Sequence, residues 1–572
     1  MKFNWRIGGE AGKGIINIGQ IFAKACLRDG LKVFSYAEYP SLIRGGHNYL
    51  NVSVSDENVY SHSSNVDLLL ALDKETIVKH NKSSSAVLCD VSLSKIVRGK
   101  CYAIPMQDIA KDLGNILYQN IVAIGATLGL VGLDLKQLNN LLRETFAHKD
   151  KKIINANIKA AKAGWDFAKN NFKFDIKLSP MPSKSKDLRG HAEQSSAWKK
   201  EDRIFISGND AIVAGAIKAG CKFISAYPMT PATSILTGMA KYSRDYNIIV
   251  KHTEDEIASI NMAIGAGFTG VRSMTCTSGG GFALMSEGLG LAAQTETPVV
   301  IAVSQRPGPA TGLATRSGQG DLQFALYSSQ DSFPRVVIAP GDVNECFYLT
   351  QQAFNIAEKY QLPVVILVDK FLSTAHSSVH NFSLNLFSKP IKIDRGKISK
   401  GAKNYKRYLI TKDGISPRTL PGTSKGEFVA SSYEHDEYGA ECEDKENKIA
   451  MTDKRYQKFE VLAKELSEPK LFGNSNNVVV SWGSTKGVVR EARKICKKDF
   501  AHIHLSFISP FPIKFFNKLS KKNLIVVEGN KTSQLSQLIR KETGIEVKHK
   551  ILKYDGRPFD PENLAKEISK LV

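Results

Sequence analysis

Short, almost uninterrupted apolar runs recur along most of this chain. Examples are Val66–Asp73, Val364–Val368 and Val478–Trp482. Runs of this length without polar alternation are typical of parallel strands that are buried on both faces of a sheet. Between such runs lie stretches with helical spacing, such as Ile15–Leu27 and 118–146. The alternation of the two patterns predicts an α/β fold built from doubly wound sheets.

The patterned stretches are separated by two regions of different composition, so we expect three α/β domains. Residues 176–200 are polar and basic, contain Pro180 and Pro182, and read as a linker. A second region is charged and rich in turn residues, and reads as an extended crossover rather than a domain. The expected boundaries are 1–175, 176–200 (linker), 201–385, 386–474 (crossover) and 475–572.

Within the crossover, four consecutive side chains could be mistaken for metal ligands: Glu434, His435, Asp436 and Glu437. Adjacent residues of an extended segment point in different directions. We therefore expect these four residues to lie at the surface.

The composition narrows the class of protein. The chain has 572 residues, of which 42% are hydrophobic and 23% charged, as in ordinary globular proteins. No apolar run is long enough to cross a bilayer, and a glycine cluster from Gly8 onward argues against a signal peptide. We expect a cytoplasmic protein without a membrane contact.

Charge and cysteine spacing argue against a nucleic-acid-binding protein and against a protein that binds metal through cysteines. The net charge is +22, but the excess is mainly dispersed lysine, so we expect a lysine-rich background or an acidic protein partner rather than a nucleic acid. The 8 cysteines are scattered and form no Cys-x-x-Cys pair. This pattern argues against structural zinc and against an iron–sulfur cluster held by this chain.

Two glycine clusters lie near the start of the chain. The first, Gly8–Gly14, follows an expected strand at residues 2–7 and precedes an apolar helix. Its amides could bind an anion at Gly12, or the turn could simply allow close packing of strand and helix. In the second, Arg44 and His47 flank a Gly-Gly corner and form a candidate contact for an anion or an acyl carrier.

The richest stretch runs from Lys222 to Leu322. It contains four segments that follow apolar strands: Tyr227–Pro231, Thr253–Glu256, Thr277–Gly281 and Arg306–Arg316. The carboxyl ends of neighbouring parallel strands are where α/β sheets bind ligands. We therefore expect these four segments to meet in one site.

Each segment also has a purely structural interpretation. Thr230 before Pro231 fits a helix N-cap, and Thr253-x-x-Glu256 fits a capping box. Arg306 and Arg316 could form surface ion pairs, although guanidinium groups on a rigid loop also suit the capture of a carboxylate. A carboxyl group at a buried helix start, as at Glu256, could keep its proton.

Taken together, the motifs resemble one family: the alpha subunits of 2-oxoacid:ferredoxin oxidoreductases with a gamma domain fused at the N-terminus, in their 2-oxoglutarate-type form. The resemblance covers nearly the whole chain. Its motifs are Ser41–His47, Tyr227–Pro231, Glu254–Gly265, Thr277–Met285, Arg306–Gly312, Ser416-Pro-Arg418, Glu434–Glu437, Glu528-x-Asn530 and Gln534-Leu535.

The resemblance implies domain identities and residue roles. The three domains would be a gamma domain, a thiamine pyrimidine-binding domain and a transketolase C-terminal-like domain. Glu256, with Glu254 as the alternative match, would hydrogen-bond the pyrimidine ring of thiamine diphosphate. The other implied contacts are Tyr227, Pro228, Ser278, Gly279 and Gly280 for the cofactor, Thr230, Arg316 and Arg306 for the 2-oxoacid, and Arg44, His47 and Gly12 for CoA or another anion.

One motif that thiamine enzymes use to bind their cofactor is missing from this sequence. Thiamine enzymes hold the diphosphate and Mg²⁺ through a Gly-Asp-Gly motif, and this chain contains none. The resemblance therefore implies a beta subunit that brings Mg²⁺ and a [4Fe-4S] cluster, in an αβ or (αβ)2 assembly, with no metal on this chain. The implied reaction is CoA-dependent oxidative decarboxylation of a 2-oxoacid, with 2-oxoglutarate favoured and ferredoxin as the electron acceptor.

Other interpretations stay open at this point. Within the family, the substrate could be pyruvate, a branched-chain 2-oxoacid or indolepyruvate, and an NAD-linked 2-oxoacid dehydrogenase component is a related alternative. In a different class, the turn at Gly8–Gly14 would suit a non-catalytic nucleotide-binding scaffold.

Overall fold

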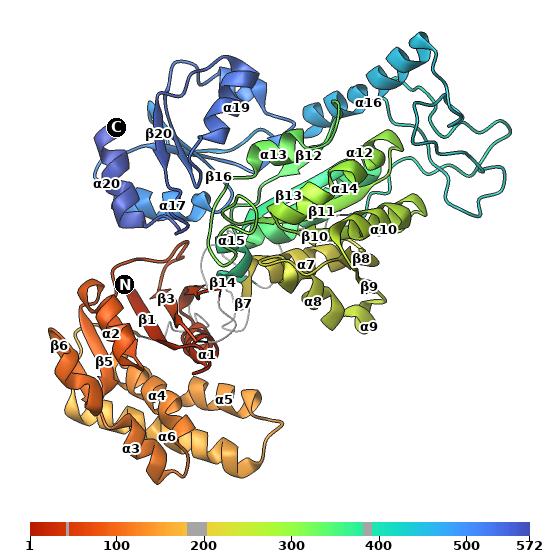
Figure 1. Cartoon of the computed structure of the whole chain (residues 1–572). Coiled ribbons are helices and arrows are strands. Elements are labelled where there is room, and N and C mark those ends of the chain that lie inside the picture. Colours follow the sequence, from red (N-terminus) through yellow and green to blue (C-terminus); the bar gives the residue numbers. More distant parts are fainter. Residues whose placement is uncertain (42–44, 180–202, 381–391) are drawn as a thin grey trace, which may run out of the picture. The chain divides into compact units, whose positions relative to one another are not determined.

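The computed structural model describes residues 1–41, 45–179, 203–380 and 392–572 (Figure 1). The chain forms two compact units. The first consists of Met1–Ile206, Ala375–Phe387 and Asp560–Glu562, and the second of Ser207–Thr374, Ser388–Phe559 and Asn563–Val572. The expected linker lies largely outside the described residues, and so does Arg44.

The first unit contains an eight-stranded sheet in the order β6-β5-β4-β1-β3-β2-β14-β7. Strands β1, β4, β5 and β6 are parallel, whereas β3 runs antiparallel to both β1 and β2. The strand bounds are β1 (Lys2–Glu10), β2 (Lys32–Glu38), β3 (His47–Ser55), β4 (Leu68–Ala71), β5 (Ala86–Asp90), β6 (Lys100–Ile104), β7 (Arg203–Ser207) and β14 (His376–His380).

Helices cover this sheet and bury a core that includes Trp5, Phe22 and Leu70. Helix α1 closely matches its prediction, but β1 continues through Gly8 and Gly9, so the glycine turn is shorter than expected. The helix bounds are α1 (Ile15–Arg28), α2 (Lys74–His80), α3 (Met106–Asp112), α4 (Gln119–Val131), α5 (Lys136–Thr145) and α6 (Lys151–Asn171), with short turns η1 (Asn81–Ser83), η2 (Val91–Ile96) and η3 (Ile116–Tyr118).

Two strands of the first sheet come from the stretch that we expected to form the second domain. Strand β14 pairs antiparallel with β2, with His376 opposite Ser35, and β7 lies next to β14. The pairing covers the edge of β2, which would otherwise present unpaired backbone groups. Local sequence patterns carry no information about this long-range pairing, so the boundary at 201 differs from the observed one.

The second unit contains a seven-stranded sheet in the order β18-β12-β13-β11-β10-β8-β9. Every pairing in it is parallel except that of β12 with β18. The strand bounds are β8 (Phe223–Ala226), β9 (Ile249–His252), β10 (Ser273–Thr277), β11 (Val299–Gln305), β12 (Val336–Ile338), β13 (Pro363–Asp369) and β18 (Phe507–Ser509).

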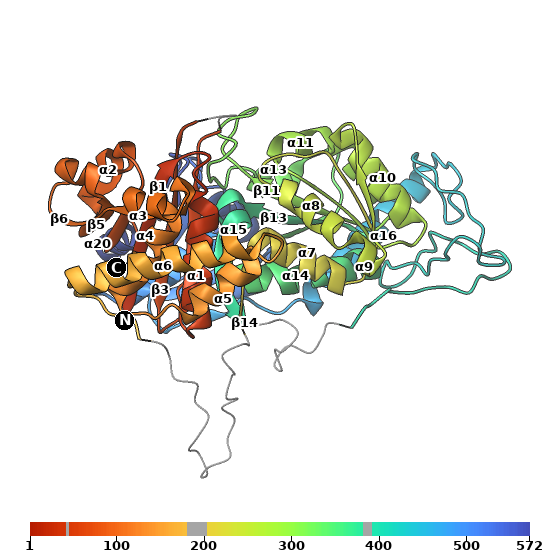
Figure 2. The ribbon, with the colours of Figure 1, turned by 90° about the horizontal axis from the view of Figure 1, so that it is seen from below.

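Helices lie on both faces of this sheet (Figures 1 and 2). One face is covered by α7 (Gly208–Lys218), α8 (Thr233–Lys241), α14 (Val343–Tyr360) and α15 (Lys370–Thr374), with α9 (Ser243–Tyr246) following α8. The other is covered by α10 (Glu256–Phe268), α11 (Gly279–Leu284), α12 (Ser286–Gln294) and α13 (Leu322–Tyr327). Strands β11 and β13 are therefore buried along their whole length, as their apolar sequences predict.

A third, five-stranded sheet completes the second unit, in the order β15-β17-β16-β19-β20. Its residues share one apolar core with the second sheet, in which Trp482 and Val526 join Ile301 and Val365. The bounds are β15 (Leu471–Phe472), β16 (Asn477–Trp482), β17 (Ala501–Leu505), β19 (Asn523–Glu528), β20 (His549–Leu552), α17 (Thr485–Ile495), α18 (Ile513–Asn517), α19 (Gln534–Thr543) and α20 (Pro561–Leu571). The prediction of an α/β fold is confirmed, with three sheets distributed over two compact units.

The crossover contains a long helix that the sequence pattern did not predict, α16 (Lys445–Glu465). Its buried stripe includes Lys454, Arg455 and Lys458 in place of apolar residues. Lys454 and Lys458 both bind the fully buried carboxylate of Glu296, with N–O distances of 2.5 and 2.8 Å. Only Met451 and Leu462 are apolar among its buried residues, so the sequence shows no continuous apolar stripe.

The expectation that Glu434–Glu437 lies at the surface is wrong for the first two residues. His435 is fully buried, with its ring 4.1 Å from that of Tyr408. Both carboxylate oxygens of Glu434 accept hydrogen bonds from the guanidinium of Arg455, at 3.0 and 2.7 Å. The segment thus packs against α16, which the sequence pattern had not revealed.

We predict that replacing Glu296 with Gln destabilises the second unit strongly. The change leaves the ammonium groups of Lys454 and Lys458 buried without a counter-charge, which typically costs about 3–5 kcal/mol. Burial already lowers the pKa of Lys458 to about 8, against the opposing effect of Glu296. The measurement is the midpoint of thermal unfolding.

The matched control is Glu468→Gln, which removes an exposed partner of Lys518. An exposed pair of this kind contributes about 0–1 kcal/mol. Equal shifts of the unfolding midpoint in the two variants would contradict the role assigned to Glu296.

Candidate functional site

Four neighbouring strands of the second sheet place the four predicted segments at one edge. Strands β9, β8, β10 and β11 are adjacent in that order and mutually parallel, so their carboxyl ends point the same way. The segments at Thr253, Tyr227, Ser278 and Arg306 follow these strands directly. The expected meeting of the four segments is therefore what the topology produces.

The corner after β8 does not cap a helix. Helix α8 begins at Thr233, beyond Thr230 and Pro231, and Thr230 is exposed. The N-cap interpretation of Thr230 is thus wrong, and its hydroxyl group is not used for capping. The guanidinium of Arg306 donates a hydrogen bond to the Thr230 carbonyl oxygen at 2.8 Å, which joins the segment after β11 to the corner.

Glu256 is buried at the start of α10, with 3% of its surface exposed. The capping-box interpretation is wrong, because the helix is capped by Asp255, whose carboxylate accepts from the Ala258 amide at 2.7 Å. The Oε1 atom of Glu256 has no hydrogen-bond partner within the described chain. Burial raises the pKa of this carboxyl group, so it holds a proton more readily than an exposed glutamate. Glu254, the alternative, is exposed.

The glycine segment is a tight strand-to-helix turn whose backbone lies close to the carboxyl group of Glu256. A Cβ atom added to Gly281 would lie only 2.6 Å from Glu256 Oε1, and one added to Gly279 would lie 2.5 Å from Asp321 Oδ2. Ser278 Oγ is buried and has no partner among the described residues. The glycines therefore let two carboxyl groups approach the same short stretch of backbone.

Asp321 lies beside the same glycine turn, although no sequence motif marks it as a candidate residue. It directly precedes α13 but makes no side-chain cap, and its Oδ2 atom is buried without a partner in the described structure. Its backbone amide donates to Gln305 Oε1 at 2.9 Å. Burial raises the pKa of Asp321 to about 6, and the nearby charge of Arg306 opposes that rise. A Gly-Asp-Leu sequence at a loop end carries no signal for this placement.

Arg316 lies further along the same loop and is half-buried. Its amide donates to the Leu313 carbonyl at 3.0 Å, and its Cβ lies 3.3 Å from where a Cβ of Gly556 would be. The structure thus links Arg306 to the corner and places Arg316 beside the third sheet. Tyr227 is exposed at the corner, with its ring 6.3 Å from that of His252.

The candidate anion contacts of the first unit lie at two adjoining turns. Gly12 is exposed with a φ of 94°, and the Ala11 amide donates to the Gly46 carbonyl at 2.9 Å. His47 Nε2 lies 2.8 Å from His80 Nε2, and burial lowers the pKa of His47. Gly12 and His47 therefore belong to neighbouring segments.

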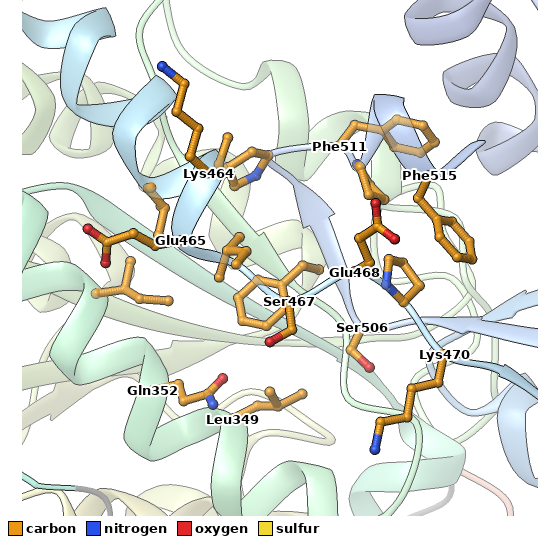
Figure 3. Close-up of a pocket in the computed structure, with 18 of the residues that line it drawn as sticks. Leu349, Gln352, Lys464, Glu465, Ser467, Glu468, Lys470, Ser506, Phe511 and Phe515 are labelled. Atoms are coloured by element: carbon orange, nitrogen blue, oxygen red, sulfur yellow. The ribbon is translucent and has the colours of Figure 1, made fainter. Parts of the chain in front are cut away.

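A separate cavity of about 1150 Å³ lies between α14, the end of α16 and α18 (Figure 3). Labelled lining residues include Leu349, Ser467 and Phe515. None of the site residues predicted from the sequence lines it. Within the described part of the chain, no three His, Cys, Asp or Glu side chains form a group that could hold a metal ion. No described helix combines the length and apolarity needed to cross a bilayer.

Comparison with known proteins assigns a class to this arrangement. Residues 214–454 match the family model described as pyruvate flavodoxin/ferredoxin oxidoreductase, thiamine diphosphate-binding. Residues 4–167 match the model described as pyruvate ferredoxin/flavodoxin oxidoreductase. The edge of the second sheet thus lies within a thiamine diphosphate-binding domain of an oxidoreductase.

Relatives that match along the whole chain narrow the class. The 2-oxoacid:ferredoxin oxidoreductase alpha subunits of Sulfolobus sp and Sulfurisphaera tokodaii are each 34% identical over 100% of this chain, covering 97% and 98% of their own lengths. A solved 2-oxoglutarate:ferredoxin oxidoreductase from Magnetococcus marinus, with 2-oxoglutarate, coenzyme A and succinyl-CoA bound, is 32% identical, with a TM-score of 0.91 over 100% of this chain and 99% of that one. The chain belongs to the family of 2-oxoacid:ferredoxin oxidoreductase alpha subunits, and the predicted family is confirmed.

We predict that Gly281→Ala weakens binding of thiamine diphosphate to the assembled enzyme by roughly 10- to 100-fold, since overpacking of this kind costs about 1–3 kcal/mol. The added methyl group would meet both Thr277 Oγ1 and Glu256 Oε1, the latter at 2.6 Å, so it would displace both side chains. Calorimetric titration of the purified complex measures the affinity.

Gly265→Ala is the matched control, because it lies on the same helix as Glu256 and its Cβ would meet nothing within 4 Å. Affinity should stay within about twofold of wild type there, since Ala suits a helix interior better than Gly. A Gly281→Ala enzyme with unchanged affinity would show that this space is not part of the cofactor site.

Proposed function

We propose that this chain is the alpha subunit of an enzyme that decarboxylates 2-oxoglutarate oxidatively, forms an acyl-CoA and passes electrons to ferredoxin. The observation that carries the proposal is the buried Oε1 atom of Glu256 beside the glycine turn, which has no hydrogen-bond partner among the described residues. The preference for 2-oxoglutarate is supported by the likeness to the Magnetococcus marinus enzyme along the whole chain.

The residues present fit the pyrimidine half of thiamine diphosphate. Glu256 offers a buried carboxyl oxygen that lacks a partner in the described structure, and Gly281 lets the backbone of the glycine turn approach this carboxyl group closely. Its raised pKa lets Glu256 share a proton with a ring nitrogen rather than remain a bare anion. Tyr227, Pro228, Ser278, Gly279 and Gly280 form the rest of this wall. When bound, the cofactor supplies the electron sink that decarboxylation of a 2-oxoacid requires.

We assign the 2-oxoacid carboxylate to Arg316, with the Thr230 hydroxyl as a second contact. Arg306 shapes this pocket, because it ties the loop to the corner through the Thr230 carbonyl. A guanidinium group matches a carboxylate in geometry and charge, so it orients the 2-oxo group relative to the cofactor. The second carboxylate of 2-oxoglutarate requires a further cation, for which the beta subunit is the candidate.

The site is half of a complete one. The sequence contains no Gly-Asp-Gly motif for the diphosphate and Mg²⁺. We therefore assign the diphosphate, Mg²⁺ and the [4Fe-4S] cluster to a beta subunit, in an αβ or (αβ)2 assembly. In the first unit, Gly12, His47 and Arg44 are assigned to CoA.

The test begins with the chain purified together with its beta subunit. We expect reduction of ferredoxin with 2-oxoglutarate and CoA, and a lower kcat/KM for pyruvate, branched-chain 2-oxoacids and indolepyruvate. An enzyme that reduced NAD⁺ but not ferredoxin would overturn the assignment of ferredoxin as the electron acceptor. A higher kcat/KM for another 2-oxoacid would overturn the assignment of 2-oxoglutarate as the substrate.

Glu256→Gln tests the mechanism within the same complex. We predict that kcat falls by roughly 10²–10⁴-fold, the usual contribution of a positioned acid–base group. Glu254→Gln, at an exposed position two residues earlier, should stay within about twofold of wild type. Unchanged turnover in Glu256→Gln would remove this residue from the mechanism and favour a non-catalytic role for the chain.

A further inference from the structure

Gln319 lies in the loop between Arg316 and Asp321, and every polar group it carries is bound to the third sheet. The residue is 2% exposed. Its Nε2 donates to the Trp482 carbonyl at 2.9 Å, and its amide donates to the Gly529 carbonyl at 2.8 Å. In return, its Oε1 accepts from the Gly529 amide at 2.8 Å and its carbonyl accepts from Asn530 Nδ2 at 3.1 Å.

The same connection continues on both sides of Gln319. Gln534 of α19 donates to the Gly320 carbonyl at 2.8 Å and accepts from the Gln323 amide at 3.0 Å. The Ser317 amide donates to the Gly556 carbonyl at 3.2 Å. The end of the loop is thus held at several points by turns of the third sheet.

Glu528 holds those turns in place. It is fully buried at the end of β19. Its carboxylate accepts hydrogen bonds from Trp482 Nε1 at 3.3 Å, Asn530 Nδ2 at 2.8 Å and the Leu535 amide at 2.9 Å. One acid thereby joins the ends of β16 and β19 to the start of α19, which are the same three places that bind the loop.

These contacts give a role to residues that the proposed reaction does not use. Glu528, Asn530 and Gln534 stand out as sequence motifs, yet the site at the edge of the second sheet contains none of them. The loop from Arg306 to Asp321 contains no helix or strand and is rich in Gly and Pro, so ordering it costs conformational entropy. Contacts outside the loop must offset that cost.

We propose that the third sheet sets the position of the loop from Arg306 to Asp321 through Gln319, which acts as a positioning residue for Arg316. The proposal rests on the proposed function, in which Arg316 holds the 2-oxoacid carboxylate. Gln319 contacts neither substrate nor cofactor in this account. It fixes the backbone three residues after Arg316 against a rigid sheet, and a displacement of about 1 Å in a substrate-orienting group can cost roughly 100-fold in rate.

The test is Gln319→Ala in the assembled enzyme. We expect kcat/KM for 2-oxoglutarate to fall by roughly 10- to 100-fold, mainly through a higher KM. Gln351→Ala is the matched control, because Gln351 is equally buried and donates one hydrogen bond within α14. It should lower stability without raising KM more than about twofold.

A double variant shows whether Gln319 acts through Arg316. If it does, Arg316→Ala/Gln319→Ala should be no slower than Arg316→Ala alone, within about twofold. If the reductions in kcat/KM of the two single variants multiply in the double variant, the two residues act independently and the proposal is overturned. Gln534→Ala removes one contact to the loop, at Gly320, and one to the start of α13, at Gln323, without altering Gln319. It should produce a smaller rise in KM and serves if Gln319→Ala does not fold.

Hydrogen exchange provides a readout that is independent of activity. In Gln319→Ala, the amides of Ser317 and Gln319 should exchange faster, while those of β13 should not change. Unchanged exchange in the loop would overturn the positioning role even if the enzyme were impaired. If the wild-type complex did not oxidise any 2-oxoacid, the proposed function would fail, whereas the exchange result would still decide whether the third sheet holds the loop.

Discussion

Parallel pairing of β9, β8, β10 and β11 is the constraint on which the candidate site depends. The register pairs Met274 with Ile224 on one side and with Val300 on the other, so the strands end close together. Because the strands are parallel, each must be followed by a crossover connection that returns the chain to the opposite end of the sheet. The four segments that begin these returns therefore collect at one edge, and their side chains face a common space.

Several buried polar atoms at that edge have no hydrogen-bond partner within the described part of the chain. Glu256, Ser278 and Asp321 each bury a polar atom without a partner in the described structure, and an unmet buried group costs about 1–3 kcal/mol. Because the fold retains these unpaired buried atoms despite their cost, we attribute them to the binding of a ligand rather than to the packing of the chain. The third sheet contacts the same edge through Gln319, so the loop from Arg306 to Asp321 is anchored by residues outside the candidate site.

Much of this organisation was readable from local sequence patterns. Buried strands such as β13, the helix after Gly14 and the four strand-end segments depend on periodicity and on turn residues that lie close together in the sequence. The errors had a common physical origin in contacts between distant residues. Helix α16 was missed because its buried stripe is cationic and pairs with Glu296, more than 140 positions earlier. Asp321 and Gln319 gained their importance only from tertiary neighbours, and the capping box was wrong because Asp255 caps the helix.

The central claim is that this chain carries only the pyrimidine-binding half of a thiamine diphosphate site. The most direct measurement is the affinity for thiamine diphosphate and Mg²⁺ of this chain alone, of the beta subunit alone and of the two together. We expect tight binding by the pair and binding at least about 100-fold weaker by this chain alone, because we assign the diphosphate and metal contacts to the partner. Equally tight binding by this chain alone would contradict the account.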